Sequence, residues 1–328
     1  MPRGQGIAIA HPRRVRYHTT MTQRRLRLLG LIFIVVLWGL SFISIKISVA
    51  VLPPMSLGAA RFALAILLLW VIKHKTAPEE KLRIRDLPYL VGAGLIGVTA
   101  YFFFENNGVR LVSASEASII IATIPVLMMV AERIYSGGRI AKRRWAGAFL
   151  SMVGVWLVAG TSVVVTGSAS GYLYMLGAAL SWVAYTFLTR PLFASRSRIY
   201  IVFWQSIFGF IGFLPFTIAE FPSWGSASVI VILNIAFLGF FCSAIGYWLY
   251  ALALGTLGIG TATVFINLIP VVTVAAGFVV LGDRLTAPQW LGAAVVLAGV
   301  YLATIETKPK ASGEDPTYHS MDKAKPNT

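Results

Sequence analysis

The chain of 328 residues is poor in charged side chains, and above all in acidic ones. Charged residues make up 12% of the chain and only 12 of them are Asp or Glu, whereas soluble domains are about 25% charged. Residues 145–189 contain no charge, and residues 199–282 contain only Glu220. Such stretches cannot form a water-facing surface, although they suit lipid. The scarcity of charge therefore excludes an ordinary soluble fold.

Cysteine and histidine are also scarce. The lone Cys242 lies inside an apolar run, so no internal disulfide can form. No Ser–His–Asp or paired-carboxylate arrangement stands out. We therefore expect no enzyme activity, no catalytic residues, no metal and no cofactor. The histidines all lie in polar segments, where they cannot build a metal site within a membrane: His11, His18, His74 and His319.

Long apolar runs are what the sequence has in abundance. Apolar residues make up 57% of the chain, and the mean hydropathy is +0.78. A spanning helix needs about 20 mostly apolar residues, and continuous rather than alternating runs argue against membrane strands. We predict an all-α integral membrane protein with ten transmembrane helices, near residues 28–48, 54–73, 87–108, 115–135, 144–161, 171–192, 199–219, 228–252, 260–282 and 288–306.

The first apolar run resembles a signal peptide, because Arg24, Arg25 and Arg27 precede it. The run is too long for a signal core, however, and no small-residue cleavage site follows it. We interpret it as the first spanning helix. The sequence does not distinguish Met1 from Met21 as the start of the protein.

The basic residues lie mostly on one side of the predicted membrane. Of 28 Lys and Arg, 24 lie in the N-terminal arm, the tail and alternate loops, and only Arg110 and Arg284 lie in the opposite loops. Cytoplasmic loops are enriched in Lys and Arg, so we predict that both termini are cytoplasmic in a protein of the cell (inner) membrane. Because no compact basic fold carries the net charge of +16, we expect no nucleic-acid partner. The expected partners are the lipid bilayer and a small-molecule substrate, and the oligomeric state is open.

The two halves of the chain resemble each other. Five spans separate the matching positions, and five is odd, so the halves cross the membrane in opposite directions. We predict an inverted 5+5 repeat, the architecture of alternating-access carriers. The predicted parts are a basic arm at 1–27, repeats at 28–161 and 171–306, and a disordered cytoplasmic tail at 307–328. Residues that match at an offset of 144 to 146 include Trp38 and Trp182, Tyr101 and Tyr247, Pro125 and Pro270, Gly147 and Gly292, and Gly154 and Gly299.

Several short motifs together resemble those of EamA-type carriers of the drug/metabolite transporter superfamily. The resemblance covers residues 28–305, and only the second half, at Asp283, keeps an acidic residue that the family often has in both; the first half has Gly138. It implies a central cavity lined by spans one, three, four, six, eight and nine, and export of amino acids or related metabolites. The motifs are Trp38-Gly39-Leu40-Ser41-Phe42, Arg61, Phe104-Glu105-Asn106, Ser113-Ala114-Ser115-Glu116-Ala117, Pro125, Pro270 and Gly282-Asp283-Arg284-Leu285.

Two charged residues are candidates for a role inside the membrane. Arg61 lies about eight residues into the second span, where a charge costs at least about 3 kcal/mol unless it is paired or reaches the interface. It either attracts a substrate carboxylate or serves as a structural partner of span-end carbonyls or of Glu105. Glu105, which we place near the outer end of span three, could couple to protons, bind an amine or be a hydrated interface residue.

The remaining candidates are polar and aromatic residues on matching spans. We predict that they line a substrate cavity together with Glu105; the alternative is packing between helices. Pro125 and Pro270 interrupt helical hydrogen bonding, and we predict a hinge or gate there rather than tolerated kinks. The predicted cavity residues are Trp38, Ser41, Tyr101, Ser118, Trp182, Tyr185, Tyr247 and Asn267.

These patterns predict a secondary transporter that exports a small metabolite, an amino acid or a derivative, by alternating access. Export of drugs or organic cations, or of sugars or nucleotide-sugars, is an alternative with the same architecture. A membrane-embedded enzyme acting on a lipid-linked substrate and a passive channel are alternatives from other classes. The coupling ion and the direction of net transport are left open.

Overall fold

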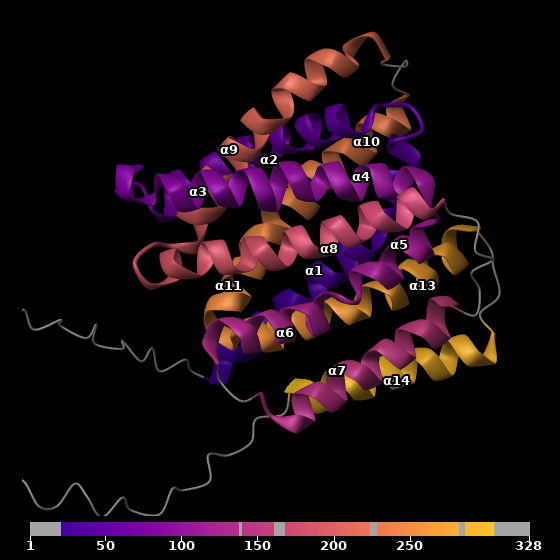
Figure 1. Ribbon diagram of the computed structural model, residues 1–328. Coiled ribbons are helices and arrows are strands. Elements are labelled where there is room, and N and C mark those ends of the chain that lie inside the picture. Colours follow the sequence, from indigo (N-terminus) through magenta and orange to yellow (C-terminus); the bar gives the residue numbers. More distant parts are fainter. Residues whose placement is uncertain (1–20, 138–139, 161–167, 224–227, 282–285, 305–328) are drawn as a thin grey trace, which may run out of the picture.

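The computed structural model describes residues 21–137, 140–160, 168–223, 228–281 and 286–304, and every regular element within them is a helix (Figure 1). Residues 1–20, the predicted tail and the motif at 282–285 lie outside the described residues. The α-helices are α1 (Met21–Ser48), α2 (Pro54–Thr76), α3 (Leu87–Gly94), α4 (Tyr101–Leu111), α5 (Ala114–Ile121), α6 (Ile124–Ser136), α7 (Lys142–Val155), α8 (Ala169–Thr189), α9 (Arg198–Glu220), α10 (Val229–Ala236), α11 (Gly246–Leu257), α12 (Ile259–Val264), α13 (Ile269–Leu281) and α14 (Ala287–Thr304).

Several short helices join end to end into longer ones. A π-helical segment, Leu95–Ala100, connects α3 to α4, and a second, Phe237–Ile245, connects α10 to α11. These two segments occupy matching positions of the two halves. Single π-helical turns inside α-helices are frequent at functional sites.

Nine helical stretches of the described chain are long and apolar enough to cross a membrane. The all-helical membrane class predicted from the sequence is therefore confirmed. The stretch outside this set is α7 with the π-helical segment Trp156–Gly160, which corresponds to the predicted span at 144–161. Three basic residues, Lys142, Arg143 and Arg144, occupy its first turn and lower its average hydropathy.

Serine side chains begin several of the helices. The hydroxyl of Ser113 accepts a hydrogen bond from the backbone N–H of Glu116, and Ser168, Ser197 and Ser228 cap α8, α9 and α10 in the same way. Each satisfies one of the backbone donors that a helix start leaves free. The serines in the loops thus fix where the apolar runs become helical.

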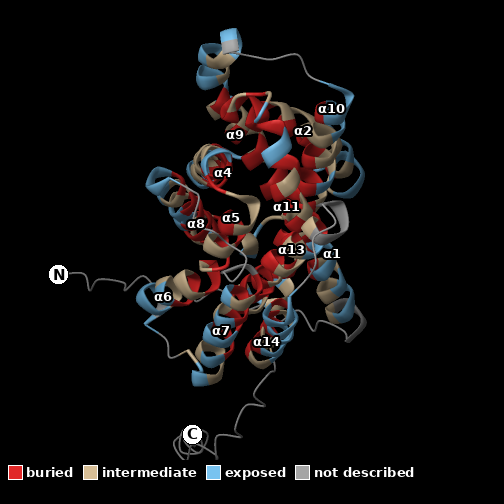
Figure 2. Ribbon diagram, turned by 90° about the vertical axis from the view of Figure 1, so that its right-hand side faces the viewer, coloured by how far each residue is buried: buried red, intermediate tan, exposed pale blue. Residues whose placement is uncertain are grey.

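The helices pack as pairs that match between the two halves (Figure 1). α4 packs on α8 as α11 packs on α1, and α3 packs on α9 as the segment Phe237–Ile245 packs on α2. Two further pairs, α2 with α9 and α7 with α14, each bring together helices at matching positions. Figure 2 shows the buried residues concentrated in the centre of the bundle, with α7 and α14 at its edge.

Glycines form the contact between α7 and α14. A methyl group added at Gly147 would lie 2.6 Å from the backbone nitrogen of Ala303, and one at Gly154 would lie 2.5 Å from that of Val296. On α14, a methyl group at Gly299 would lie equally close to the backbone of α7, and one at Gly292 equally close to that of the segment Trp156–Gly160. Small residues let two helices approach to backbone contact in a membrane, so these four glycines define a seam, called here the glycine seam.

Polar contacts tie the helix ends together at both rims of the bundle. At one rim, Glu220 accepts hydrogen bonds from the backbone N–H of Ser56 (2.7 Å) and Met55 (3.2 Å) at the start of α2. At the other, Arg196 Nε donates to Asp86 Oδ2 over 2.7 Å, and this hydrogen bond raises the pKa of the Arg196 guanidinium. We call them the Glu220 rim and the Asp86 rim.

Candidate functional site

A small cavity lies among α1, α2, α4, α8 and α11 and the two interrupted spans α5–α6 and α12–α13. Its volume is about 30 Å³, enough for about two water molecules and too small for a metabolite. The lining comes from the six spans that the resemblance implies and also from α2, which contributes Arg61. Of the predicted substrate-binding residues, those that line it are Trp38, Ser41, Tyr101, Glu105, Trp182 and Tyr247.

Four aromatic rings at matching positions form one cluster against this cavity. The Trp38 and Trp182 rings lie 5.4 Å apart at 85°, edge to face, and the Trp182 ring lies 5.2 Å from Tyr101 and 5.5 Å from Tyr247. Such edge-to-face and tilted contacts are the favourable geometries for aromatic pairs. The cluster offers an apolar surface whose ring faces also attract cations.

Hydrogen bonds fix the orientation of the two indoles. Trp38 Nε1 donates to the backbone carbonyl of Cys242 over 3.1 Å, and Trp182 Nε1 donates to the hydroxyl of Tyr250 over 3.4 Å. Each indole N–H thereby has a partner away from water, as a buried donor requires. The ring faces are held in place for whatever occupies the cavity.

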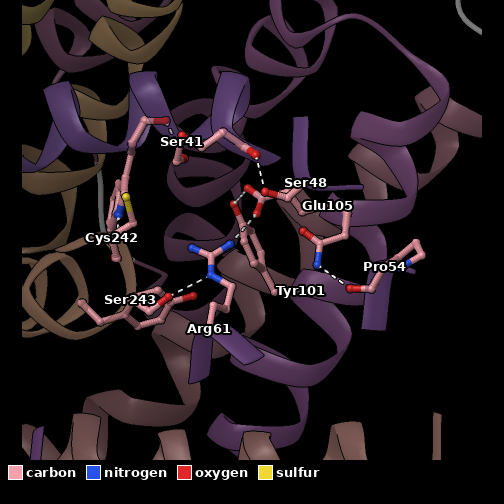
Figure 3. Close-up of polar contacts among 12 residues, drawn as sticks. Ser41, Ser48, Pro54, Arg61, Tyr101, Glu105, Cys242 and Ser243 are labelled. Atoms are coloured by element: carbon pink, nitrogen blue, oxygen red, sulfur yellow. Dashed lines mark hydrogen bonds and ion pairs between the residues drawn. The ribbon is translucent and has the colours of Figure 1, made fainter. Parts of the chain in front are cut away.

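Arg61 is the cation of the site, and it is 2% exposed (Figure 3). Its Nε donates to Ser243 Oγ over 2.9 Å, and its guanidinium lies over the Phe102 ring, 4.2 Å from the centroid. Its Nη1 lies 3.9 Å from Glu105 Oε2 and has no hydrogen-bond partner among the described residues. The structural role expected for Arg61 is therefore present in part, as a pair with Glu105.

Glu105 is the anion of the site, and it is 4% exposed rather than hydrated at an interface. Its Oε1 accepts a hydrogen bond from the Tyr101 hydroxyl over 2.7 Å, one turn earlier on α4. Of the alternatives for Glu105, the hydrated interface residue is therefore wrong. The neighbouring helix explains this: Asn106 Nδ2 donates to the carbonyl of Pro54 over 2.8 Å, so this part of α4 packs against the start of α2.

The spans that contain Pro125 and Pro270 are interrupted beside the cavity. α6 begins with Ile124-Pro125 after a turn, and α13 begins with Ile269-Pro270 after a 3₁₀ segment, Phe265–Leu268. Proline fits the first turn of a helix, where its missing N–H is not needed. The isoleucines beside these interruptions line the cavity: Ile121, Ile124, Ile266 and Ile269.

Three predicted site residues lie outside the lining. Ser118 is buried one turn before Ile121, and its hydroxyl donates to the carbonyl of Ser115 over 2.7 Å. Tyr185 packs behind Trp182, with ring centroids 5.5 Å apart. Asn267 Nδ2 donates to Ser151 Oγ of α7, so its amide points away from the aromatic cluster.

Seven residues at the site were missed by the sequence reasoning: the four isoleucines of the lining and three others. Phe42 and Phe102 line the cavity, and Ser243 anchors Arg61. Ser243 lies one helical turn before Tyr247, so it shares that residue's face of the helix. This spacing was the signal that could have found it.

No group of three or more His, Cys, Asp or Glu side chains within the described residues could hold a metal ion. The arrangement of the site is one of recognition: a fixed cation, a fixed anion and an aromatic wall.

Comparison with known proteins gives a consistent result. A model of the EamA-like transporter family matches the chain twice, over residues 26–160 and 169–305. A solved protein chain, described only as a protein crystal structure, superposes with a TM-score of 0.69 at 19% sequence identity, covering 86% of this chain and 98% of its own. This likeness shows a shared fold.

Curated relatives match along almost their whole length. An uncharacterized transporter of Archaeoglobus fulgidus is 29% identical over 82% of this chain and 95% of its own. A probable terminal-alkyne amino-acid exporter of Streptantibioticus cattleyicolor is 27% identical over 85% and 93%. A probable amino-acid metabolite efflux pump of Escherichia coli is 27% identical over 83% and 92%.

Proposed function

Because the chain belongs to the EamA-like transporter family, we propose that it exports a small metabolite, an amino acid or a derivative, across the cytoplasmic membrane by alternating access. The observation that carries the proposal is the cavity lined by Trp38, Trp182, Tyr101 and Tyr247 and by the Arg61–Glu105 pair. A buried ion pair beside aromatic rings suits an amphipathic metabolite with charged groups. The names of two relatives, an amino-acid exporter and an amino-acid metabolite efflux pump, support the same class.

The proposed architecture is ten spans in two inverted halves. Besides the nine stretches described above, the proposal counts α7 with Trp156–Gly160 as a span, the fifth along the chain. Its apolar residues Phe149 and Val153 are exposed on the outside of the bundle, at 52% and 54%. The matched helix pairs, the matched π-helical segments and the double family match all support two equivalent halves. We propose domains at 28–161 and 171–306.

The proposed orientation places the Asp86 rim in the cytoplasm. α1 begins and α14 ends at this rim, so both termini would be cytoplasmic, as the excess of Lys and Arg indicates. The lone, buried Cys242 offers a test. In a Cys242→Ala background, a membrane-impermeant thiol reagent should label a cysteine placed at Ala50 on intact cells, and one at Glu79 only after permeabilisation; the reverse pattern would invert the orientation.

Alternating access also suits the size of the cavity. With about 30 Å³, the site has no room for a metabolite, so it must widen toward one rim to accept one. Inverted halves can exchange conformations and thereby widen the site toward each rim in turn. The interruptions before Pro125 and Pro270, which flank the cavity, are the proposed hinges.

Counterflow in proteoliposomes tests the proposed function. Vesicles loaded with one unlabelled amino acid should accumulate the same labelled amino acid transiently, because a carrier exchanges substrate through a moving site. Parallel loads of a sugar, a nucleotide-sugar and an organic cation test the other substrate classes. Flux that never saturates with substrate concentration would indicate a channel. If counterflow occurs only with a load other than an amino acid, the class of that load replaces amino acids as the substrate class.

A further inference from the structure

The Arg61 guanidinium is held in a fixed position without being saturated. Ser243 Oγ accepts a hydrogen bond from its Nε over 2.9 Å (Figure 3). The centroid of the Phe102 ring lies 4.2 Å from its Cζ. Nη1 is buried and has no hydrogen-bond partner among the described residues. A buried donor without a partner destabilises the protein, the more so when it is charged, so a group that accepts a hydrogen bond from it would be bound strongly.

The Glu105 carboxylate faces Arg61 without docking on it. The distance of 3.9 Å between Arg61 Nη1 and Glu105 Oε2 is well beyond the roughly 2.7–2.9 Å of a charge-assisted hydrogen bond. The other oxygen of Glu105 is held by the Tyr101 hydroxyl at 2.7 Å. Both ends of the pair are thus anchored from behind, and the space between them lies at the cavity wall.

The charge balance of the cavity selects for the charge of its ligand. Arg61 and Glu105 are the two formal charges in its lining, and they cancel. A ligand with a single charge would leave one uncompensated charge in a low-dielectric site, which is expensive. A ligand that carries one positive and one negative group leaves the sum at zero.

Resting on the proposed function, we propose that this pair recognises a zwitterion, with the substrate carboxylate on Arg61 and the substrate ammonium on Glu105. Arginine presents a planar fork that matches a carboxylate, and Nη1 supplies a free donor for it. The ammonium binds the carboxylate of Glu105 and lies near the aromatic rings, whose faces also attract cations. The side chain of the substrate packs against Trp38 and Trp182.

The proposal distinguishes three kinds of ligand that share an aromatic wall. An organic cation uses Glu105 and leaves Arg61 unpaired, and an organic anion does the opposite. Each loses a hydrogen bond to a charged group, which corresponds to about tenfold weaker binding or more. The zwitterion is therefore preferred over both of its singly charged derivatives.

The test compares three probes that share the phenylalanine side chain and differ in the charge of their amino and carboxyl groups. Binding of L-phenylalanine, N-acetyl-L-phenylalanine and L-phenylalanine methyl ester to the purified full-length protein is measured by competition with labelled L-phenylalanine. The wild type should bind the zwitterion about tenfold or more tightly than either derivative. Equal affinity for all three overturns the proposal.

Two variants should shift the preference in opposite directions. Glu105→Gln should reduce the difference in affinity between L-phenylalanine and its N-acetyl derivative. Arg61→Gln should reduce the difference in affinity between L-phenylalanine and its methyl ester. If a variant binds L-phenylalanine too weakly for competition, the affinity is measured by direct binding of the labelled derivative: the N-acetyl derivative for Glu105→Gln and the methyl ester for Arg61→Gln. If the pair had only a structural role, each substitution would instead weaken the binding of all three probes by the same factor, and this result would overturn the assignment.

Further variants keep the test valid if Arg61→Gln does not fold. Ser243→Ala removes only the hydrogen bond to Arg61 Nε. It should weaken the binding of L-phenylalanine about fivefold and keep the order of affinity of the three probes. The matched control is Gln205→Leu, at the position of the second half that corresponds to Arg61, which should leave the order unchanged. A changed order in Ser243→Ala with Arg61 still present would contradict the assigned role of Arg61.

Failure of this inference and failure of the proposed function give different results. If neither L-phenylalanine nor L-leucine binds, the zwitterion assignment is overturned, while saturable counterflow of another metabolite would still identify a carrier. If an amino acid is carried but its charged derivatives bind equally well, only the role of the pair is overturned. Absence of counterflow with every load would remove the proposed function itself.

Discussion

The two halves of the chain contribute equally to the aromatic cluster and unequally to its charge. Trp38 and Tyr101 in the first half have their counterparts in Trp182 and Tyr247. The positions that match Arg61 and Glu105 are occupied by Gln205 and Ala251, which are buried and uncharged. The scaffold of the site is thus repeated, and its ion pair is confined to one half.

For the proposed carrier, this difference separates the features that suit motion from the features that suit substrate selection. In the proposed alternating-access cycle, two halves of similar shape exchange conformations, and the matched rings and helix pairs suit such an exchange. A polar substrate also needs one preferred orientation, and a charge pair present twice would offer two. Under the proposed recognition, a pair confined to one half gives the substrate a single orientation.

The largest effect is expected from breaking the charge asymmetry itself. Arg61→Leu leaves Glu105 buried without its cation, which should cost about 3–5 kcal/mol of stability and remove transport. Gln205→Leu removes only a hydrogen bond of 3.4 Å to Tyr185 and should cost about 1 kcal/mol or less. Thermal unfolding in detergent and counterflow measure the two effects.

The double variant Arg61→Leu with Glu105→Leu separates stability from function. Replacing both members of a buried ion pair by apolar residues is often neutral or stabilising, so the double variant should recover most of the lost stability without recovering amino-acid transport. Full recovery of transport would show that the pair does not bind substrate.

A smaller effect should come from the glycine seam, where the two halves are expected to respond alike. Gly147→Ala and Gly292→Ala each place a methyl group 2.6 Å from backbone nitrogen, and overpacking of this kind costs about 1–3 kcal/mol. Gly30→Ala on α1 is the control, because no atom lies within 4 Å of the added methyl group. Unequal losses in thermal stability at the two seam positions would count against equivalent halves.

The smallest effects should distinguish the two indoles. Trp38→Phe loses the 3.1 Å hydrogen bond to the Cys242 carbonyl, worth about 1 kcal/mol, and should raise the half-saturation concentration about fivefold. Trp182→Phe loses a longer bond, of 3.4 Å, to Tyr250, and should change it by about twofold or less. The concentration dependence of counterflow provides both values, and a larger effect at Trp182 would reverse the comparison.

The parts of the site that could be predicted from the sequence are those indicated by depth within a span and by recurrence in the two halves. The recurrence of Trp38 at Trp182 and of Tyr101 at Tyr247 indicated a shared location, and all four rings line the cavity. Depth alone did not determine which way Asn267 faces. It lies in a 3₁₀ segment with about three residues per turn, so that Ile266 and Ile269 line the cavity while Asn267 meets α7.

The pairing of Arg61 with Glu105 was one of several alternatives that the sequence allowed. A charge within a span requires a partner, but the partner depends on which helices become neighbours. Ser243 is 182 residues away along the chain, and the packing of α2 against the segment Phe237–Ile245 brings it to Arg61. Contacts of this kind come from tertiary packing, which hydropathy and spacing do not encode.

The glycine seam has a consequence for each half of the chain taken alone. Gly147 meets the backbone at Gly299, and Gly154 meets it at Gly292, while Gly147 and Gly154 match Gly292 and Gly299 in the repeat. Each glycine therefore faces the residue that matches, in the repeat, the other glycine of its own helix. A helix with this spacing is complementary to an inverted copy of itself, so a single five-helix unit with the same two glycines would carry the surface needed to form an antiparallel pair with a second copy.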